Sequence, residues 1–224
     1  NKKGTLMFIW SEVKSKIDII WNKFWSGGIA NPLNAIEQIT ALIVLKLLSE
    51  NDNKKKLEAT FTEEEYNTIF NKRIKPEDKD DLSTFKMANW DEFRELDSET
   101  MLETVRDIAF PFIKKYNEGT EFNKSLKDLA FIITKPSLLS ETVEGIQEIF
   151  NLLEEDEEGF MDSLGDMYEY LLSEISSSGK NGQFRTPRHI IKMITELVNP
   201  QIGEKVFDPS CGTAGFLVSA YSHI

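Results

Sequence analysis

The sequence is poor in cysteine and histidine, and this scarcity excludes several kinds of site. Its 224 residues contain one cysteine, Cys211, and two histidines. A single cysteine excludes an internal disulfide and suits a reducing compartment, so we expect a cytoplasmic protein. His189 and His223 stand alone, and no acids or cysteines have the spacing of metal ligands. We therefore expect neither a metal site nor a cysteine nucleophile.

The sequence also lacks the marks of membrane insertion and secretion. No apolar run approaches the about 18 residues that cross a bilayer. The first residues show no basic region followed by an apolar core and a cleavage site. An apolar content of 40%, with 15 Phe and 4 Trp, is enough for a packed core. These features predict a folded protein with no membrane partner.

Nearly everything before residue 180 has the apolar period of an α-helix. Gly27-Gly28 ends the first pattern, Asn31-Pro32 opens the next, and Pro111 divides a later one. The aromatic residues, Trp25 among them, follow the helical spacing and are predicted to be core. The polar run 51–56 is predicted to be a connector. The expected helices cover residues 6–24, 32–50, 62–70, 98–113, 122–133, 137–153 and 159–175.

The most informative segment covers residues 205–217. Lys205–Phe207 predicts a strand that ends at Asp208-Pro209, Gly212 and Gly215 free the backbone, and a helical pattern resumes at Ala214. Such a turn points backbone N–H groups and a helix N-terminus at a ligand with a carboxylate or phosphate. The structural alternative is a tight turn between a strand and a helix.

A second segment, Gln183-Phe184-Arg185-Thr186-Pro187-Arg188, lies about 20 residues upstream, before a helix that leads into the strand. Its structural alternative is a threonine N-cap and a first-turn proline of that helix. Together the two segments resemble the N6-adenine DNA methyltransferases, most closely the modification subunits of type I restriction–modification systems. The resemblance is sharp over residues 164–224 and general before them. Arg185 stands where many members carry an aromatic residue, and Ala214 where glycine is common.

The resemblance implies S-adenosylmethionine as the cofactor, DNA as the substrate, and the specificity and restriction subunits as partners. It implies methyl transfer to adenine N6, with DNA sequence recognition delegated to the specificity subunit. The backbone of residues 208–215 would then meet the methionine carboxylate, and Asp208 would face the cationic side of the cofactor. The implied cofactor-binding residues are Gln183, Phe184, Arg185, Thr186, Pro187, Arg188, Asp208, Gly212, Thr213, Ala214 and Gly215.

The family binds the target adenine through an Asn/Asp-Pro-Pro-aromatic segment, which these 224 residues lack. Asn31-Pro32 and Asn199-Pro200 have no second proline and no aromatic residue. We therefore predict no catalytic residue here and no activity of this chain alone. The expected fold is mostly α. A multi-helix domain over residues 1–160 precedes residues 161–224, a linker helix plus the truncated start of an α/β methyltransferase domain.

The net charge of −12 is unfavourable for phosphate contacts, but its distribution is uneven. Twelve acids and no base lie between Glu141 and Glu174, whereas Lys180 to Lys205 contains five bases and two acids. We interpret the acidic stretch as a solvated face that does not meet DNA.

Two other classes stay open from the residues alone. One is a helical protein-interaction module without cofactor binding. The other is a fragment of a dinucleotide-binding oxidoreductase built on Gly212 and Gly215, whose distinguishing acid would lie about 20 residues beyond the glycines.

Overall fold

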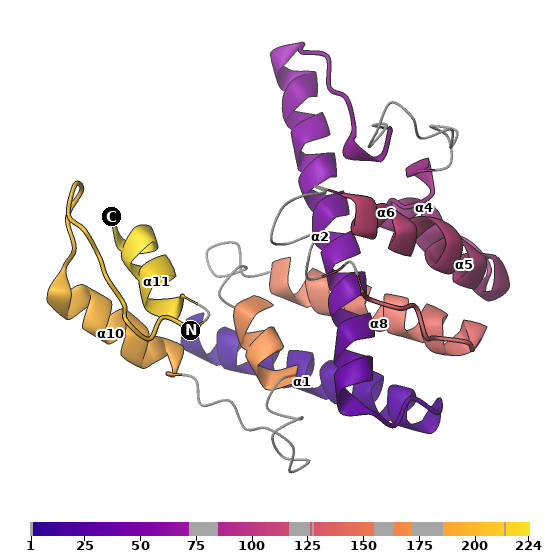
Figure 1. The fold of residues 1–224 in the computed structure, drawn as a ribbon, viewed down its shortest axis with the longest axis horizontal. Coiled ribbons are helices and arrows are strands. Elements are labelled where there is room, and N and C mark those ends of the chain that lie inside the picture. Colours follow the sequence, from indigo (N-terminus) through magenta and orange to yellow (C-terminus); the bar gives the residue numbers. More distant parts are fainter. Residues whose placement is uncertain are drawn as a thin grey trace. The chain divides into compact units, whose positions relative to one another are not determined.

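In a computed structural model of the chain, residues 2–71, 85–116, 126, 128–154, 164–171, 186–212 and 214–224 are described, with backbone alone for 2–8 and 71. The chain divides into two compact units, Asn1–Ser178 and Gly179–Ile224, here called unit 1 and unit 2. All regular elements in the described ranges are helical (Figure 1). The predicted mostly α fold is thereby confirmed, while the proposed boundary after residue 160 stays a prediction.

Unit 1 begins with two long helices, α1 (Lys2–Ser26) and α2 (Pro32–Thr62). The predicted end at Gly27-Gly28 and the predicted start at Asn31-Pro32 are confirmed, and the Asn31 side chain caps α2 by accepting from the Leu33 N–H at 3.1 Å. The connector predicted at residues 51–56 is wrong, because α2 continues through it. Its Lys and Asn side chains are compatible with an exposed helix, so polarity alone did not mark a break.

The segment after α2 folds back onto the buried carboxylate of Asp52. That carboxylate accepts from Tyr66 Oη at 2.6 Å, Thr68 Oγ1 at 2.5 Å and the Ile69 N–H at 2.9 Å. Burial and the hydrogen bond to Asp52 raise the pKa of the Tyr66 phenol above its ordinary value. The helix predicted for residues 62–70 is wrong, since residues 64–68, which these bonds hold against α2, have no helical structure before the short 3₁₀ turn η1 (Ile69–Asn71).

The remaining elements of unit 1 are short except for one. The helix predicted at 98–113 is broken by a π-helical turn, in which the Phe110 N–H bonds to the Val105 carbonyl just before Pro111. The predicted division at Pro111 is therefore confirmed. The elements are α4 (Trp90–Arg94), α5 (Ser98–Thr104), the π-helix η2 (Val105–Ala109), α6 (Phe110–Lys115), α8 (Pro136–Glu154) and a helical stretch at 164–171.

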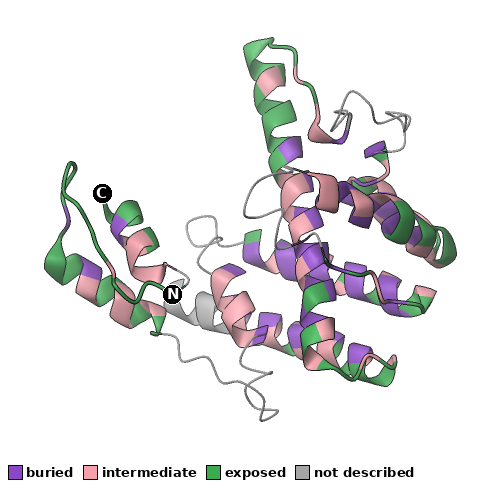
Figure 2. Cartoon of the chain, in the orientation of Figure 1, coloured by how far each residue is buried: buried purple, intermediate pink, exposed green. Residues whose placement is uncertain are grey.

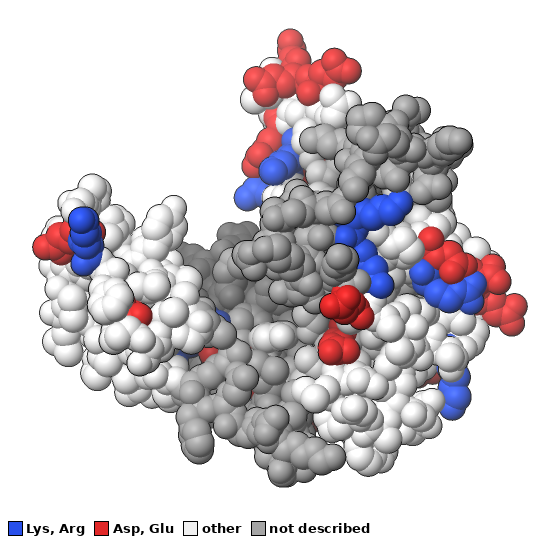
Figure 3. All heavy atoms as spheres, in the orientation of Figure 1, with Lys and Arg blue, Asp and Glu red and all other residues white. Residues whose placement is uncertain are grey.

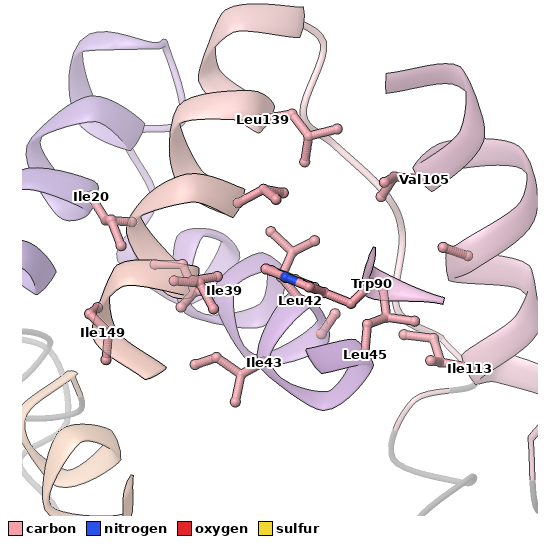
Figure 4. Close-up of a cluster of buried hydrophobic side chains, with 14 of the residues drawn as sticks. Ile20, Ile39, Leu42, Ile43, Leu45, Trp90, Val105, Ile113, Leu139 and Ile149 are labelled. Carbon is pink, nitrogen blue, oxygen red and sulfur yellow. The ribbon is translucent and has the colours of Figure 1, made fainter. Parts of the chain in front are cut away.

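The core of unit 1 lies where α1, α2 and α8 meet (Figures 2 and 4). Ile20, Ile43 and Ile149 come from these three helices, and they line one apolar cavity together with Met167 of the 164–171 stretch. Trp90 and several phenylalanines are fully buried, as predicted. The prediction is wrong for Trp25, which is 59% exposed at the end of α1.

Within the described ranges one helix, α2, is long and apolar enough to cross a membrane, although the sequence predicts no such segment. However, 56% of its most apolar window is buried inside unit 1. A core helix meets the same criteria of length and composition, so the finding gives little support to a membrane span.

The helix predicted for residues 122–133 is wrong for residues 129–133, which have no helical structure, whereas residue 126 is helical. Gln38 of α2 hydrogen-bonds the backbone of this stretch on both sides of Phe131. Its Nε2 donates to the Ala130 carbonyl at 2.9 Å, and its Oε1 accepts from the Ile132 N–H at 3.1 Å. Gln38 is 1% exposed, so solvent does not compete for these bonds.

We predict that Gln38→Leu lowers the free energy of unfolding by about 2–4 kcal/mol, because it leaves a backbone carbonyl and an N–H without their partner. Urea denaturation followed by circular dichroism measures the change. Thr60→Val is the control, since the Thr60 hydroxyl is exposed and bonds only its own helix. A loss for Gln38→Leu as small as that of the control would contradict the role assigned to Gln38.

Candidate functional site

Unit 2 contains two helices, α10 (Arg188–Val198) and α11 (Gly215–His223), where the sequence predicted them. The strand predicted at Lys205–Phe207 does not form within the described residues. A strand is stabilised by ladder hydrogen bonds to a neighbour. The described part of unit 2 offers no second strand, and Phe207 is 85% exposed.

The loop before α11 is a tight reversal of the backbone. The Ser210 N–H donates to Asp208 Oδ1 at 2.9 Å, and the Ala214 N–H donates to the Cys211 carbonyl at 2.6 Å. Gly212 at φ +51° and Ala214 at φ +64° both take the left-handed conformation. Among the described residues beyond its two chain neighbours, a Cβ on Gly212 would meet only the Ser210 carbonyl, at 3.9 Å, so they leave this side of the loop open to a ligand.

Both helices begin without a side-chain cap. Pro187 stands at the N-cap of α10 and Ala214 at the N-cap of α11, and neither of these two residues makes a side-chain capping bond. The structural alternative for Thr186 is therefore wrong, because the threonine precedes the cap position. Uncapped N–H groups at a helix N-terminus favour a negatively charged group.

Three pairs of residues, each 24 apart in sequence, join α10 to α11. Ile191 Cδ1 lies 3.0 Å from the position of a Cβ on Gly215, Thr195 Oγ1 lies 2.9 Å from Ser219 Oγ, and His223 Nε2 lies 2.9 Å from Asn199 Oδ1. The pairs advance by four residues on both helices, so the two helices are parallel and in register. Their N-termini, which follow the two predicted motifs, therefore lie at the same end (Figure 1).

The predicted site residues are only partly described. Gln183, Phe184, Arg185 and Thr213 lie outside the described residues. The others flank the two helix N-termini: Thr186, Pro187 and Gly212 are exposed, and Arg188, Asp208, Ala214 and Gly215 are half-buried.

Sequence reasoning missed the residues that join the two helices. His223 was read as isolated, although it pairs with Asn199. The available signal was the matching spacing of four residues in both helical patterns. Among the described residues, no group of three or more His, Cys, Asp or Glu side chains is placed to hold a metal ion.

Two family models match the chain in succession. The family described as "HsdM N-terminal domain" matches residues 13–146, which include most of unit 1. The family described as "N-6 DNA Methylase" matches residues 160–224, which include both motifs. No solved structure matches the chain significantly.

Relatives with assigned names point the same way. The EcoEI methylase subunit of Escherichia coli, a type I restriction enzyme subunit, is 26% identical over 97% of this chain and 42% of its own length. The EcoKI methylase subunit of E. coli K12 is 48% identical over 28% of this chain and 12% of its own length. The MjaVIII methylase subunit of Methanocaldococcus jannaschii is 33% identical over 49% of this chain and 20% of its own length.

The chain thus spans less than half the length of these relatives. The first family model covers residues 13–146, more than half of the chain, and the second continues from residue 160 to residue 224. The chain belongs to the family of methylase subunits of type I restriction enzymes.

Proposed function

We propose that this chain is the N-terminal part of an adenine-specific DNA methyltransferase subunit, and that unit 2 binds the methionine end of S-adenosylmethionine. The observation that carries the proposal is the parallel register of α10 and α11. It puts the starts of two helices, each without a side-chain cap and each preceded by a predicted motif, at one end of unit 2.

The residues present fit this cofactor. Backbone N–H groups at the start of α11 bind the methionine carboxylate, and the open side of Gly212 lets the ligand approach the loop. Asp208 keeps one carboxylate oxygen on the Ser210 N–H, which fixes its orientation toward a cationic group. Thr186 and Arg188 close the site from α10. The cofactor itself supplies an activated methyl group.

The proposed substrate is adenine in DNA, methylated at N6 with the help of residues outside this chain. The proposed partners are DNA and the specificity and restriction subunits, and the proposed location is the cytoplasm. Unit 1 serves DNA enclosure and subunit packing. The matched family and the names of the relatives support this proposal. An oxidoreductase is not supported, because both motifs fall within the N-6 DNA methylase match.

In the full-length protein, Gly212→Val is expected to weaken S-adenosylmethionine binding more than Thr186→Ala. Valine fills the open side of the loop and is strained at φ +51°. Each lost hydrogen bond to a charged group lowers affinity by roughly ten- to a hundredfold. Isothermal calorimetry measures the dissociation constants, and thermal unfolding confirms that the variants are folded.

The matched control is Gly203→Ala, since Gly203 also has a positive φ and open surroundings but lies outside both motifs. Unchanged affinity in a folded Gly212→Val variant would exclude this loop as the cofactor site. A full-length protein that binds no S-adenosylmethionine would favour the helical interaction module.

The 224-residue chain alone is expected to fold but not to methylate DNA, because it contains no Asn/Asp-Pro-Pro-aromatic segment to bind the adenine. Incubation with duplex DNA and methyl-labelled S-adenosylmethionine tests this. Label transferred to DNA above the level of a protein-free control would show that the catalytic residues lie within the chain.

A further inference from the structure

Thr195 of α10 and Ser219 of α11 form a polar pair between the two helices, and Ser219 lies one turn after the start of α11. Thr195 is 6% exposed, and no other polar side chain in the described part of unit 2 is buried. Its partner Ser219 is half-buried, and Ala220 beside it is buried. The small residues of α11 thus let the two helices approach closely at this level.

The two hydroxyls form a directed chain of hydrogen bonds. Thr195 Oγ1 lies 3.0 Å from the Ile191 carbonyl and 2.9 Å from Ser219 Oγ. A carbonyl only accepts, so the single Thr195 proton goes to Ile191, and Ser219 donates to Thr195. The buried hydroxyl therefore both donates and accepts a hydrogen bond, and removing the hydroxyl of either residue breaks this link between the helices.

This chain of bonds ends on the residue that touches the cofactor loop. Ile191 receives the Thr195 bond on its carbonyl, and its side chain packs where a Cβ on Gly215 would lie. Apolar contacts alone allow two helices to slide along each other, whereas the Thr195–Ser219 and His223–Asn199 bonds, both 2.9 Å, set their axial register. The first of these bonds lies one turn nearer the start of α11. The register in turn sets how far the start of α11 lies from Thr186.

We propose that Thr195 and Ser219 are positioning residues, which hold the two cofactor-binding segments in register and so set the affinity for S-adenosylmethionine. This inference rests on the proposed function. It adds a pair of residues that lies one helical turn from the loop and needs no contact with the cofactor.

The test is a double-mutant cycle in the full-length subunit with Thr195→Val, Ser219→Ala and both together. We expect each single variant to lower S-adenosylmethionine affinity by about three- to tenfold, and the double variant to bind no more weakly than the weaker single one. Thr195→Ser keeps the hydroxyl and is expected to restore most of the affinity. Calorimetry gives affinity, and steady-state kinetics separates KM for the cofactor, which rises, from kcat.

Two controls separate positioning from folding. Ser222→Ala removes an exposed hydroxyl from the same helix, and Thr142→Val removes a buried hydroxyl that bonds its own helix in unit 1 at 2.6 Å. Both are expected to leave cofactor affinity unchanged. Thr195→Val and Ser219→Ala variants with lowered thermal stability but wild-type affinity, or additive effects in the cycle, would overturn the proposal.

The Gly212→Val variant distinguishes this failure from that of the proposed site. If Gly212→Val loses affinity while the Thr195 and Ser219 variants do not, the loop binds the cofactor and only the positioning role is wrong. If wild type and Gly212→Val bind equally, the proposed site is wrong and the positioning role falls with it.

Discussion

Unit 1 is organised by the need to satisfy polar side chains that α2 carries into the core. A buried polar group without a partner is costly, and three of these side chains, Gln38, Ser49 and Asp52, each bond to a segment outside α2 and fix its position. Gln38 holds the stretch around Ala130, Ser49 accepts from the Trp90 N–H at 2.8 Å, and Asp52 holds the return from α2 to η1. Lys46 bonds to Glu50 and lies over the rings of Trp90 and Phe150.

The apolar contacts of α2 make unit 1 compact, but they do not by themselves choose among ways of packing α4, η1 and the stretch near Ala130. Hydrophobic burial is non-directional, whereas each of the polar contacts joins named atoms. The same division of roles holds in unit 2. There α10 and α11 share few buried residues, and the hydroxyl pair of Thr195 and Ser219 sets a register that apolar contact leaves free.

The sequence predicted the end of α1 and the start of α2 well because Gly27-Gly28 and Asn31-Pro32 are local signals, but it placed the end of α2 twelve residues too early. It failed where a distant side chain decides the outcome. Residues 62–70 have a capping pattern, yet the Asp52 carboxylate takes up their donors instead. Gln38 likewise holds residues 130–132 without helical structure, although their pattern is helical. In unit 2 the two motifs could be recognised from the order of their residues. The parallel register of their helices could not be predicted, because it depends on contacts between residues 24 apart in sequence.

The net charge of −12 is partly compensated locally by ion pairs between helices of unit 1. Three acids of the acidic stretch are about half exposed, which is compatible with a solvated face, and they also pair with bases of neighbouring helices. Glu141 pairs with Lys23 at 2.7 Å, Glu148 with Lys16 at 2.6 Å, and Glu144 with Arg94 at 3.3 Å.

Part of the negative charge of α8 is therefore paired with bases of α1 and α4. Other acids gather at the C-terminal end of α2, where Glu63, Glu64 and Glu65 are exposed (Figure 3). At physiological ionic strength a charge acts over about 8 Å. Within unit 2 itself, residues 180–205 carry five bases and two acids, and the two helix N-termini add positive partial charge that favours a phosphate or carboxylate.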